Sequence, residues 1–274
     1  MKNYDKKTVQ SFGEEWEDFD QSKVPKSELT NLFNNYFKIF PWNKLSKNSV
    51  GYDMGCGSGR WAKFVSSKAG HLHCIDPSRA IFVAKRNLKT KKNITFHKSF
   101  IENVKLTKNS MDFGYSLGVL HHVPDTQKAI NKCVHLLKHN APFLVYIYYS
   151  LDNRPFWVKI IWNFSNILRF FISRLPRILK FIVADLIALL IYFPISRFYL
   201  LLKIFKIKSK NLPLLFYSNL SFYTIRTDAR DRFGTPLEKR FSKKEIKTMM
   251  KRAGLEKIKF SNKAPYWIAL GFKK

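Results

Sequence analysis

The chain of 274 residues has few of the residues that stabilise small secreted proteins. It contains three cysteines, Cys56, Cys74 and Cys133, which is too few for a disulfide framework. No two of them have the C-x-x-C spacing of zinc ribbons or thioredoxin-like sites, and we expect no metal site. Residues 1–20 are polar and lack the apolar segment of a secretory signal. We therefore expect a cytoplasmic protein with reduced thiols.

Acidic residues are also scarce. The chain has 19 Asp and Glu against 49 Lys and Arg, a formal charge of +30. Such an excess is typical of proteins that bind nucleic acid or anionic membrane surfaces, but compositional bias also produces it. A content of 46% hydrophobic residues excludes a disordered polycation. The basic residues are spread along the chain rather than gathered in one arm, so charge alone does not indicate nucleic acid.

Short apolar runs alternate with helical patterns between residues 49 and 150. The runs are Ser49–Gly55, His71–Pro77, Ile94–Ser99, Met111–Gly118 and Ala141–Ser150. The helical patterns between them are Ser58–Ala69, Ser78–Thr90 and Asp125–Lys138. Strands that alternate with helices predict an α/β fold with a parallel sheet covered on both faces.

The C-terminal segment completes this plan. Ser242 and Glu245 form a capping-box pattern at the start of a helix that Gly254 ends. Two strand-like runs follow, Leu255–Ser261 and Tyr266–Phe272, separated by a short turn. We predict a terminal hairpin at the edge of the sheet.

A glycine-rich segment carries most of the functional information. Asp53 is followed by Gly55, Gly57 and Gly59 between an expected strand and an expected helix. Glycines at this spacing let the backbone turn tightly and approach a ligand closely. Asp76 ends the next strand, where an acid can accept hydrogen bonds from ribose hydroxyls. An acid at position 53 suits a ligand with a cationic amino group better than a diphosphate.

These residues resemble the first motif of the class I S-adenosylmethionine-dependent methyltransferases, in particular the type 11 group. Met111–Asp125 is similar to the fourth-strand motif of that family, and Leu136–Phe143 to its approach to strand five. The resemblance covers residues 45–150 strongly and 232–274 loosely. It implies a Rossmann-like seven-stranded sheet with an antiparallel last strand, and S-adenosyl-L-methionine as cofactor.

The resemblance also implies where the cofactor binds. The glycines would lie near its methionine part, Asp76 at its ribose, and the residues after strand four along its side. Phe100 stands where the family often has an acid for the adenine, so stacking and backbone groups would hold that ring instead. The predicted cofactor residues are Trp16, Asp53, Gly55, Cys56, Gly57, Gly59, Arg60, Asp76, Pro77, Ser78, Phe100, Ile101, Leu117, Gly118 and Val119.

Methyl transfer to oxygen or carbon usually needs a base, whereas a neutral nitrogen needs none. His121 and His122 follow strand four and are the candidate bases, although either could instead pack or cap the next helix. The candidate substrate residues are Tyr146, Arg226, Asp228 and Asp231; the last three could also form a solvated salt-bridge cluster. Phe12–Trp16 resembles the lid of related enzymes or is an ordinary packed aromatic pair.

Residues 151–231 form an apolar and basic insertion between strand five and the terminal hairpin. On a helical wheel, one side of its first part is basic and the other apolar, a pattern of interfacial helices, with Lys159, Arg169, Arg174, Arg177 and Lys180 on the basic side. Phe181–Leu202 is long enough to span a bilayer but contains charges. We expect a helical substrate cap, a peripheral membrane anchor or a span. A further basic run contains Lys203, Lys206, Lys208 and Lys210.

The predicted organisation is an N-terminal helical cap over residues 1–44, a cofactor-binding core over 45–150, the insertion over 151–231 and a completing segment over 232–274. The predicted activity is methyl transfer to a small or lipid-like acceptor. A polar-metabolite methyltransferase and a non-catalytic scaffold remain as alternatives. A nucleic-acid substrate is not expected, because Ser116–Val119 lacks the N/D-P-P-Y/F motif of adenine-amino methyltransferases.

Overall fold

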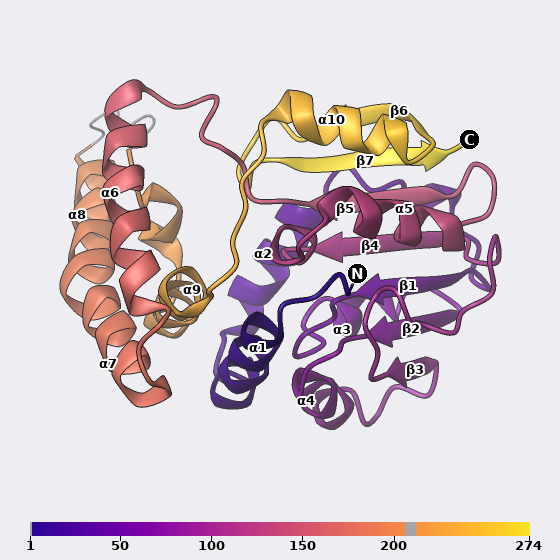
Figure 1. The fold of residues 1–274 in the computed structure, drawn as a ribbon, viewed down its shortest axis with the longest axis horizontal. Helices are drawn as coiled ribbons and strands as arrows, with labels where there is room; N and C mark the ends of the chain where they lie inside the picture. Colours follow the sequence, from indigo (N-terminus) through magenta and orange to yellow (C-terminus); the bar gives the residue numbers. More distant parts are fainter. Residues whose placement is uncertain (1, 206–211) are drawn as a thin grey trace. The chain divides into compact units, whose positions relative to one another are not determined.

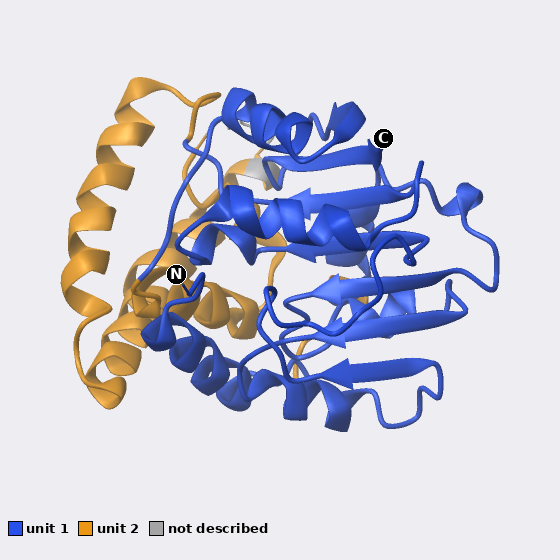
Figure 2. Cartoon of the chain, turned by 45° about the vertical axis from the view of Figure 1, so that its right-hand side comes forward, with its two compact units in different colours: residues 1–22, 29–150, 237–274 blue, residues 23–28, 151–236 orange. Residues whose placement is uncertain are grey.

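The computed structural model describes residues 2–205 and 212–274 (Figure 1). They form two compact units (Figure 2). The first contains residues 1–22, 29–150 and 237–274, and the second contains residues 23–28 and 151–236. Of the predicted basic run, Lys206, Lys208 and Lys210 lie outside the described residues.

The first unit is built on one seven-stranded sheet. Its order is β3-β2-β1-β4-β5-β7-β6. The strands are β1 (Val50–Met54), β2 (His71–Ile75), β3 (Ile94–His97), β4 (Phe113–Leu117), β5 (Pro142–Tyr146), β6 (Leu255–Phe260) and β7 (Ile268–Lys273). Strands β1 to β5 pair in parallel, whereas β7 is antiparallel to both of its neighbours. The predicted fold class, including the reversed last strand and the terminal hairpin, is confirmed.

Helices cover the sheet and connect its strands (Figure 1). They are α1 (Lys6–Asp18), α2 (Lys26–Phe37), α3 (Ala62–Val65), α4 (Ala80–Asn87), α5 (Thr126–Leu136) and α10 (Lys243–Arg252), with 3₁₀ turns η1 (Trp42–Lys44) and η2 (Leu120–His122). The capping box at Ser242 is confirmed, and Gly254 has the expected left-handed φ of +86°.

One local prediction was wrong. The helix expected over Ser58–Ala69 is reduced to α3, because the chain as far as Gly59 is still turning with positive φ angles. The helix expected over Asp125–Lys138 is present as α5, and the Asp125 side chain caps it by accepting from the N–H of Lys128.

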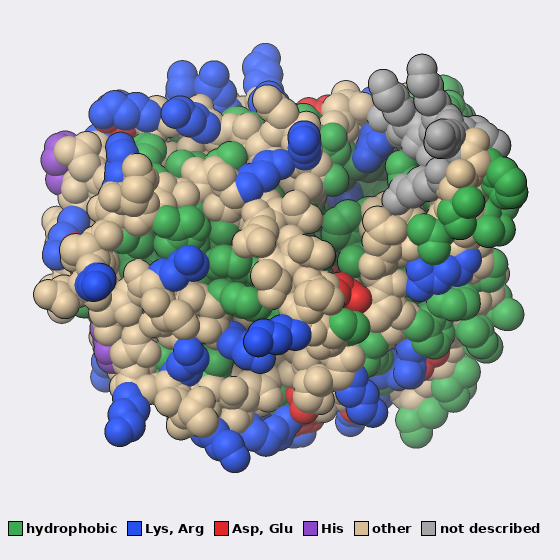
Figure 3. All heavy atoms as spheres, turned by 180° about the vertical axis from the view of Figure 1, so that it is seen from behind, with side chains coloured by type: hydrophobic (Ala, Val, Ile, Leu, Met, Phe, Trp, Pro, Cys, Tyr) green, Lys and Arg blue, Asp and Glu red, His purple; other side chains and the backbone are tan. Residues whose placement is uncertain are grey.

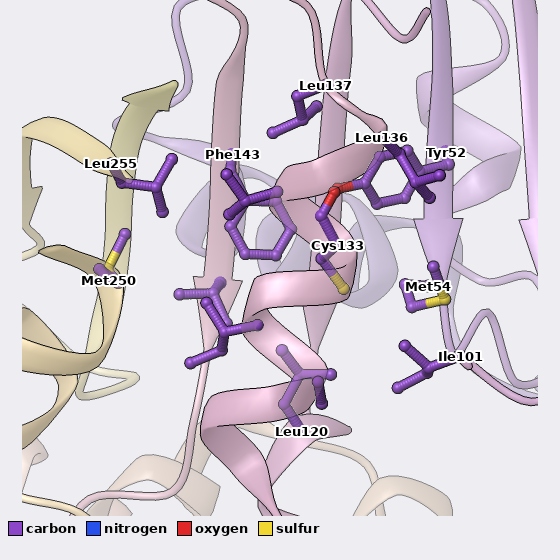
Figure 4. Close-up of a cluster of buried hydrophobic side chains, with 14 of the residues drawn as sticks. Tyr52, Met54, Ile101, Leu120, Cys133, Leu136, Leu137, Phe143, Met250 and Leu255 are labelled. Atoms are coloured by element: carbon purple, nitrogen blue, oxygen red, sulfur yellow. The ribbon is translucent and has the colours of Figure 1, made fainter. Parts of the chain in front are cut away.

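The core lies between the sheet and helices α5 and α10 (Figure 4). Its centre depends on glycines that leave room for rings of the neighbouring strand. Tyr52 of β1 is paired in register with Gly114 of β4, and a Cβ on Gly114 would lie 2.1 Å from the ring of Tyr52. The hydroxyl of Tyr52 donates to the carbonyl of Cys133 at 2.8 Å, which ties β1 to α5. This packing fixes the carboxyl end of β1, where the glycine-rich loop begins.

The second unit is helical. Its elements are α6 (Phe156–Ile172), α7 (Arg177–Ile187), a π-helical turn η3 (Ala188–Tyr192), α8 (Phe193–Ile204), a 3₁₀ turn η4 (Leu215–Asn219) and α9 (Phe222–Gly234). Pro176 separates α6 from α7, as expected for a residue that cannot continue a helix. The continuous helix Arg177–Leu202 has 26 residues and is long and apolar enough to cross a membrane by length and composition.

Candidate active site

The loop that follows β1 is shaped by its glycines. Gly55, Gly57 and Gly59 have φ angles of +83°, +53° and +77°, in the region that side chains disfavour. A Cβ on Gly55 would also lie 2.4 Å from Val119, so the loop and the turn after β4 are in close contact. The N–H groups of Gly55 and Cys56 both donate to the carbonyl of Ile75. The loop is therefore joined to the carboxyl end of β2.

Asp76, directly after β2, is hydrogen-bonded to the same loop. One of its carboxylate oxygens, Oδ2, accepts from the N–H of Gly57 at 3.0 Å. The other, Oδ1, accepts from the N–H of Ser78 at 2.8 Å and from its hydroxyl at 2.6 Å. Burial raises the pKa of Asp76, and these hydrogen bonds oppose the shift. The predicted residues Gly57, Asp76 and Ser78 thus form one connected group.

Asp53 lies under the loop and is only 1% exposed. Its Oδ2 has no hydrogen-bond partner among residues 2–205 and 212–274. Burial raises the pKa of Asp53 to about 8, and the nearby charge of Asp76 adds to the shift, while Tyr115 and Arg60 oppose it. A buried acceptor with no donor is costly on its own. The arrangement suits a ligand that brings a cationic donor to this carboxylate.

The N-terminal segment lies against several parts of the site. Asn3 binds the backbone of Asp125 twice, accepting from its N–H at 2.6 Å and donating to its carbonyl at 2.9 Å. Trp16 in α1 lies against the loop, where a Cβ on Gly57 would be 3.1 Å from the indole. The guanidinium of Arg60 lies over the rings of Trp16 and Trp61, at 5.2 and 4.5 Å. These contacts place the N-terminal segment as a cover over the glycine loop.

Tyr4 lies against a predicted site residue, a contact that the sequence did not indicate. Its ring stacks on Phe100, with 3.8 Å between the ring centroids. Phe100 is the residue that replaces the family's adenine-binding acid, so the position carries an aromatic surface in place of a carboxylate. The neighbouring Ile101 is buried in the main core with Met54 and Ile75, which makes its side chain a packing residue.

The two histidines after β4 are both buried but differ in their hydrogen bonds. Nδ1 of His122 lies 2.7 Å from the carbonyl oxygen of Leu237. Because a carbonyl only accepts, we assign a proton to Nδ1, so that Nε2 is the ring nitrogen that can accept a proton. The N–H of Tyr148 donates to Nδ1 of His121 at 3.5 Å, which assigns the proton of neutral His121 to Nε2.

Burial, with the nearby His122, Arg240 and Lys239, lowers the pKa of His121 well below its usual range. His121 is therefore neutral at physiological pH and presents an N–H donor at Nε2. His122 presents a lone pair instead, so the geometry distinguishes the two candidates and favours His122 as the proton acceptor.

Aromatic rings surround these histidines. Tyr148 stacks on His121 with a centroid distance of 3.9 Å, and Tyr146 at the end of β5 lies 5.7 Å from Tyr148. Tyr36 meets Tyr146 edge-on at 5.2 Å. Arg240 lies 5.1 Å from the centre of the Tyr148 ring and forms a 2.9 Å ion pair with Glu238. The predicted residue Tyr146 thus belongs to a larger aromatic group beside the histidines.

Comparison with known proteins agrees with this geometry. Residues 52–145 match the model of a family described as a methyltransferase domain. No curated protein matches the chain.

Solved structures match a larger part of the chain. The YcgJ protein of Bacillus subtilis is 15% identical, with a TM-score of 0.51 over 86% of this chain and 70% of that one. A proposed methyltransferase of Bacillus halodurans is 12% identical, with a TM-score of 0.51 over 86% and 72%. Phosphoethanolamine N-methyltransferase 2 of Haemonchus contortus, solved with S-adenosylhomocysteine, is 15% identical, with a TM-score of 0.50 over 94% and 47%. At these identities they show that the fold is shared.

The residues of this matched segment fit S-adenosyl-L-methionine, the cofactor that the sequence resemblance implies. Asp53 supplies a buried acceptor for an ammonium group, the glycine loop leaves space beside the backbone, and Asp76 is an acid at the ribose position. Leu117 ends β4, Gly118 and Val119 follow it beside this loop, and Gly118 has a φ of +79°. The finding supports S-adenosylmethionine-dependent methyl transfer as the general activity.

Three predicted substrate residues lie outside this unit. Arg226, Asp228 and Asp231 are on α9 of the second unit. Arg226 forms an ion pair with Asp185 of α7 at 2.6 Å, and Asp231 lies 3.5 Å from the hydroxyl of Thr235. These contacts are within the helical unit. Their assignment to substrate stays a prediction.

Proposed function

We propose that this protein transfers a methyl group from S-adenosyl-L-methionine to a small or lipid-like acceptor. The observation that carries the proposal is the buried Oδ2 of Asp53 beneath the glycine loop, which has no hydrogen-bond partner in the part of the chain that the structure describes. A carboxylate whose pKa is raised to about 8 gains most from a bound cation, because the cation restores its charged form. The bound cofactor supplies an electrophilic methyl group on a sulfonium.

The protein's part is to orient the reactants and exclude water. Asp53 and Asp76 would hold the two polar ends of the donor, and Trp16 with the N-terminal segment would cover it. When bound, the cofactor would supply a methyl group that an acceptor atom held in line could take from its sulfur. Nε2 of His122 would take the proton that a hydroxyl acceptor loses. The rings of Tyr36, Tyr146 and Tyr148 support an acceptor with apolar surface near its reacting group.

Cofactor binding is tested by isothermal titration of the full chain with S-adenosylmethionine and S-adenosylhomocysteine. We expect the wild type to bind both, and Asp76→Asn to weaken binding by about tenfold or more, since a hydrogen bond to a charged group contributes roughly 1.5–3 kcal/mol. Glu256→Gln is the matched control, because Glu256 lies on edge strand β6 and pairs with Lys257. Lack of binding by the wild type would refute the proposal.

The role of His122 is tested by replacing each histidine separately with Gln. Release of S-adenosylhomocysteine is measured in the presence of a cell extract that supplies the acceptor. We expect His122→Gln to lower the rate by roughly 10²–10⁴-fold, the usual contribution of a general base. Cofactor affinity should stay unchanged. A larger loss for His121→Gln than for His122→Gln would show that the assignment of the base is wrong.

A further inference from the structure

The helices of the second unit have an outer surface that is almost entirely apolar. Every exposed residue between positions 178 and 202 is apolar. The side chain of Phe164 in α6 is 64% exposed and that of Leu190 in η3 is 67% exposed. Figure 3 shows hydrophobic side chains gathered over these helices. The exposed large apolar residues of α6, α7, η3 and α8 are Phe156, Trp157, Ile160, Ile161, Phe164, Ile167, Leu168, Phe170, Phe171, Ile178, Leu179, Ile182, Leu186, Leu189, Leu190, Ile191, Phe198, Leu201 and Ile204.

Two charged side chains of the same helices, Arg169 and Lys180, are buried. Arg169 is 8% exposed and donates to the carbonyls of Thr235 and Pro236 at 2.9 and 3.1 Å. Lys180 is 7% exposed and lies 3.5 Å from the carbonyl of Gly234. The helical wheel placed these two cations on one basic side with Arg174 and Arg177, but in the structure Arg169 and Lys180 are buried, whereas Arg174 and Arg177 are exposed. They donate to backbone carbonyls at the end of α9 and directly after it.

Two further charged residues of the long helix, Asp185 and Arg197, also have partners within the second unit. Asp185 of α7 forms ion pairs with Arg226 and Arg230 of α9, at 2.6 and 2.7 Å. Arg197 of α8 donates to the carbonyls of Ser218 and Leu220, each at 2.8 Å. Lys180, Asp185 and Arg197 of the long helix therefore all have partners within the unit. Charged groups inside and apolar groups outside reverse the usual order of a water-soluble helical unit.

We propose that the outer face of α6 to α8 docks in the plane of an anionic lipid bilayer. Lipid offers no hydrogen bonds, so a surface in contact with it must be apolar and must have its polar groups satisfied internally. A protein partner would instead meet a polar rim, whereas every residue classed as exposed at positions 178–202 is apolar and the polar ones are at most partly exposed. Arg174 and Arg177 are exposed at the junction of α6 and α7, where cations would meet anionic headgroups.

Docking in the plane fits better than a crossing of the bilayer. By length alone the helix Arg177–Leu202 could cross the membrane, because it extends roughly 39 Å and the hydrocarbon core is about 30 Å thick. However, α9 is rich in charged residues and packs along α7. A spanning α7 would carry this polar helix and its ion pairs to membrane depth, which is costly. An interfacial position leaves α9 on the water side.

The test is flotation of the full chain with vesicles of phosphatidylcholine, alone or mixed with phosphatidylglycerol. We expect the wild type to float with the mixed vesicles. The double variant Phe164→Asp with Leu190→Asp should bind at least about tenfold more weakly, because it removes two anchors from the apolar face. Phe82→Asp is the matched control, since Phe82 is 51% exposed on α4 in the first unit. Circular dichroism of each variant checks that its helices are intact.

Three results would overturn the proposal. The first is a wild type that stays in solution with both kinds of vesicle. If sedimentation analysis then shows a dimer, the apolar face is covered by a second copy of the chain and not by lipid. The second is equal flotation of the wild type and the double variant. The third is a wild type that resists extraction by alkaline carbonate, which would indicate a span. Cofactor titration of the same preparations is independent of these results and so tests the methyltransferase function separately.

Discussion

Replacing Asp53 with Asn should stabilise the protein without cofactor while it damages cofactor binding. The Asn side chain keeps the shape of the carboxyl but cannot titrate. The folded protein holds the pKa of Asp53 at about 8, whereas the ordinary value is 3.8. At any pH between these two values, folding is therefore accompanied by uptake of a proton at Asp53.

The size of the effect follows from the difference in pKa. The loss in free energy of unfolding that comes from the raised pKa of Asp53 is absent below pH 3.8. It grows as the pH rises and levels off above about 8. Each pH unit in this window corresponds to about 1.4 kcal/mol, so at pH 7 Asp53 lowers the free energy of unfolding by about 4 kcal/mol. The amide of Asn also needs hydrogen bonds and offsets part of the gain. The change of the stability difference with pH therefore tests the raised pKa of Asp53 better than the size of that difference at one pH.

The assay is urea unfolding of the wild type, Asp53→Asn and the control Glu256→Gln at several pH values between 5 and 9. We expect the stability advantage of Asp53→Asn to increase with pH up to about 8. S-adenosylhomocysteine should reverse the order, because its ammonium group would stabilise the ionised Asp53 of the wild type. A difference that does not change with pH, or that favours the wild type without ligand, would refute the raised pKa.

Two other substitutions test the core and the cover of the site. Gly114→Ala should lower the free energy of unfolding by about 1–3 kcal/mol in urea titrations, because its Cβ would overlap the ring of Tyr52; an unchanged midpoint would contradict this packing. Asn3→Ala removes two hydrogen bonds to Asp125 and should speed release of S-adenosylhomocysteine in stopped-flow measurements, with little effect on stability; an unchanged release rate would show that the N-terminal segment does not retain the ligand.

The glycine loop and its acids could be predicted because their information is local. Gly55, Gly57 and Gly59 adopt the conformation that their residue type allows, and Asp76 meets the loop because both follow adjacent parallel strands. The strand pattern also determined the sheet, including its reversed last strand. These features depend on residue type, alternation and spacing along a short segment.

Contacts between distant segments could not be predicted in this way. The hydrogen bond from His122 to Leu237 joins residues far apart in the chain, yet it decides which ring nitrogen carries the proton. The stacking of Tyr4 on Phe100 likewise has no local signal. In the insertion, the helical wheel separated the two faces, but only the position of α9 shows that Arg169 and Lys180 point inward.

The most direct test of the methyltransferase function is transfer of a labelled methyl group from S-adenosylmethionine to components of polar and lipid extracts. The wild type should label at least one component and release S-adenosylhomocysteine in equal amount, and Asp76→Asn should do so at a rate lower by about tenfold or more. Absence of label and of S-adenosylhomocysteine release above the background without enzyme would contradict the proposed activity.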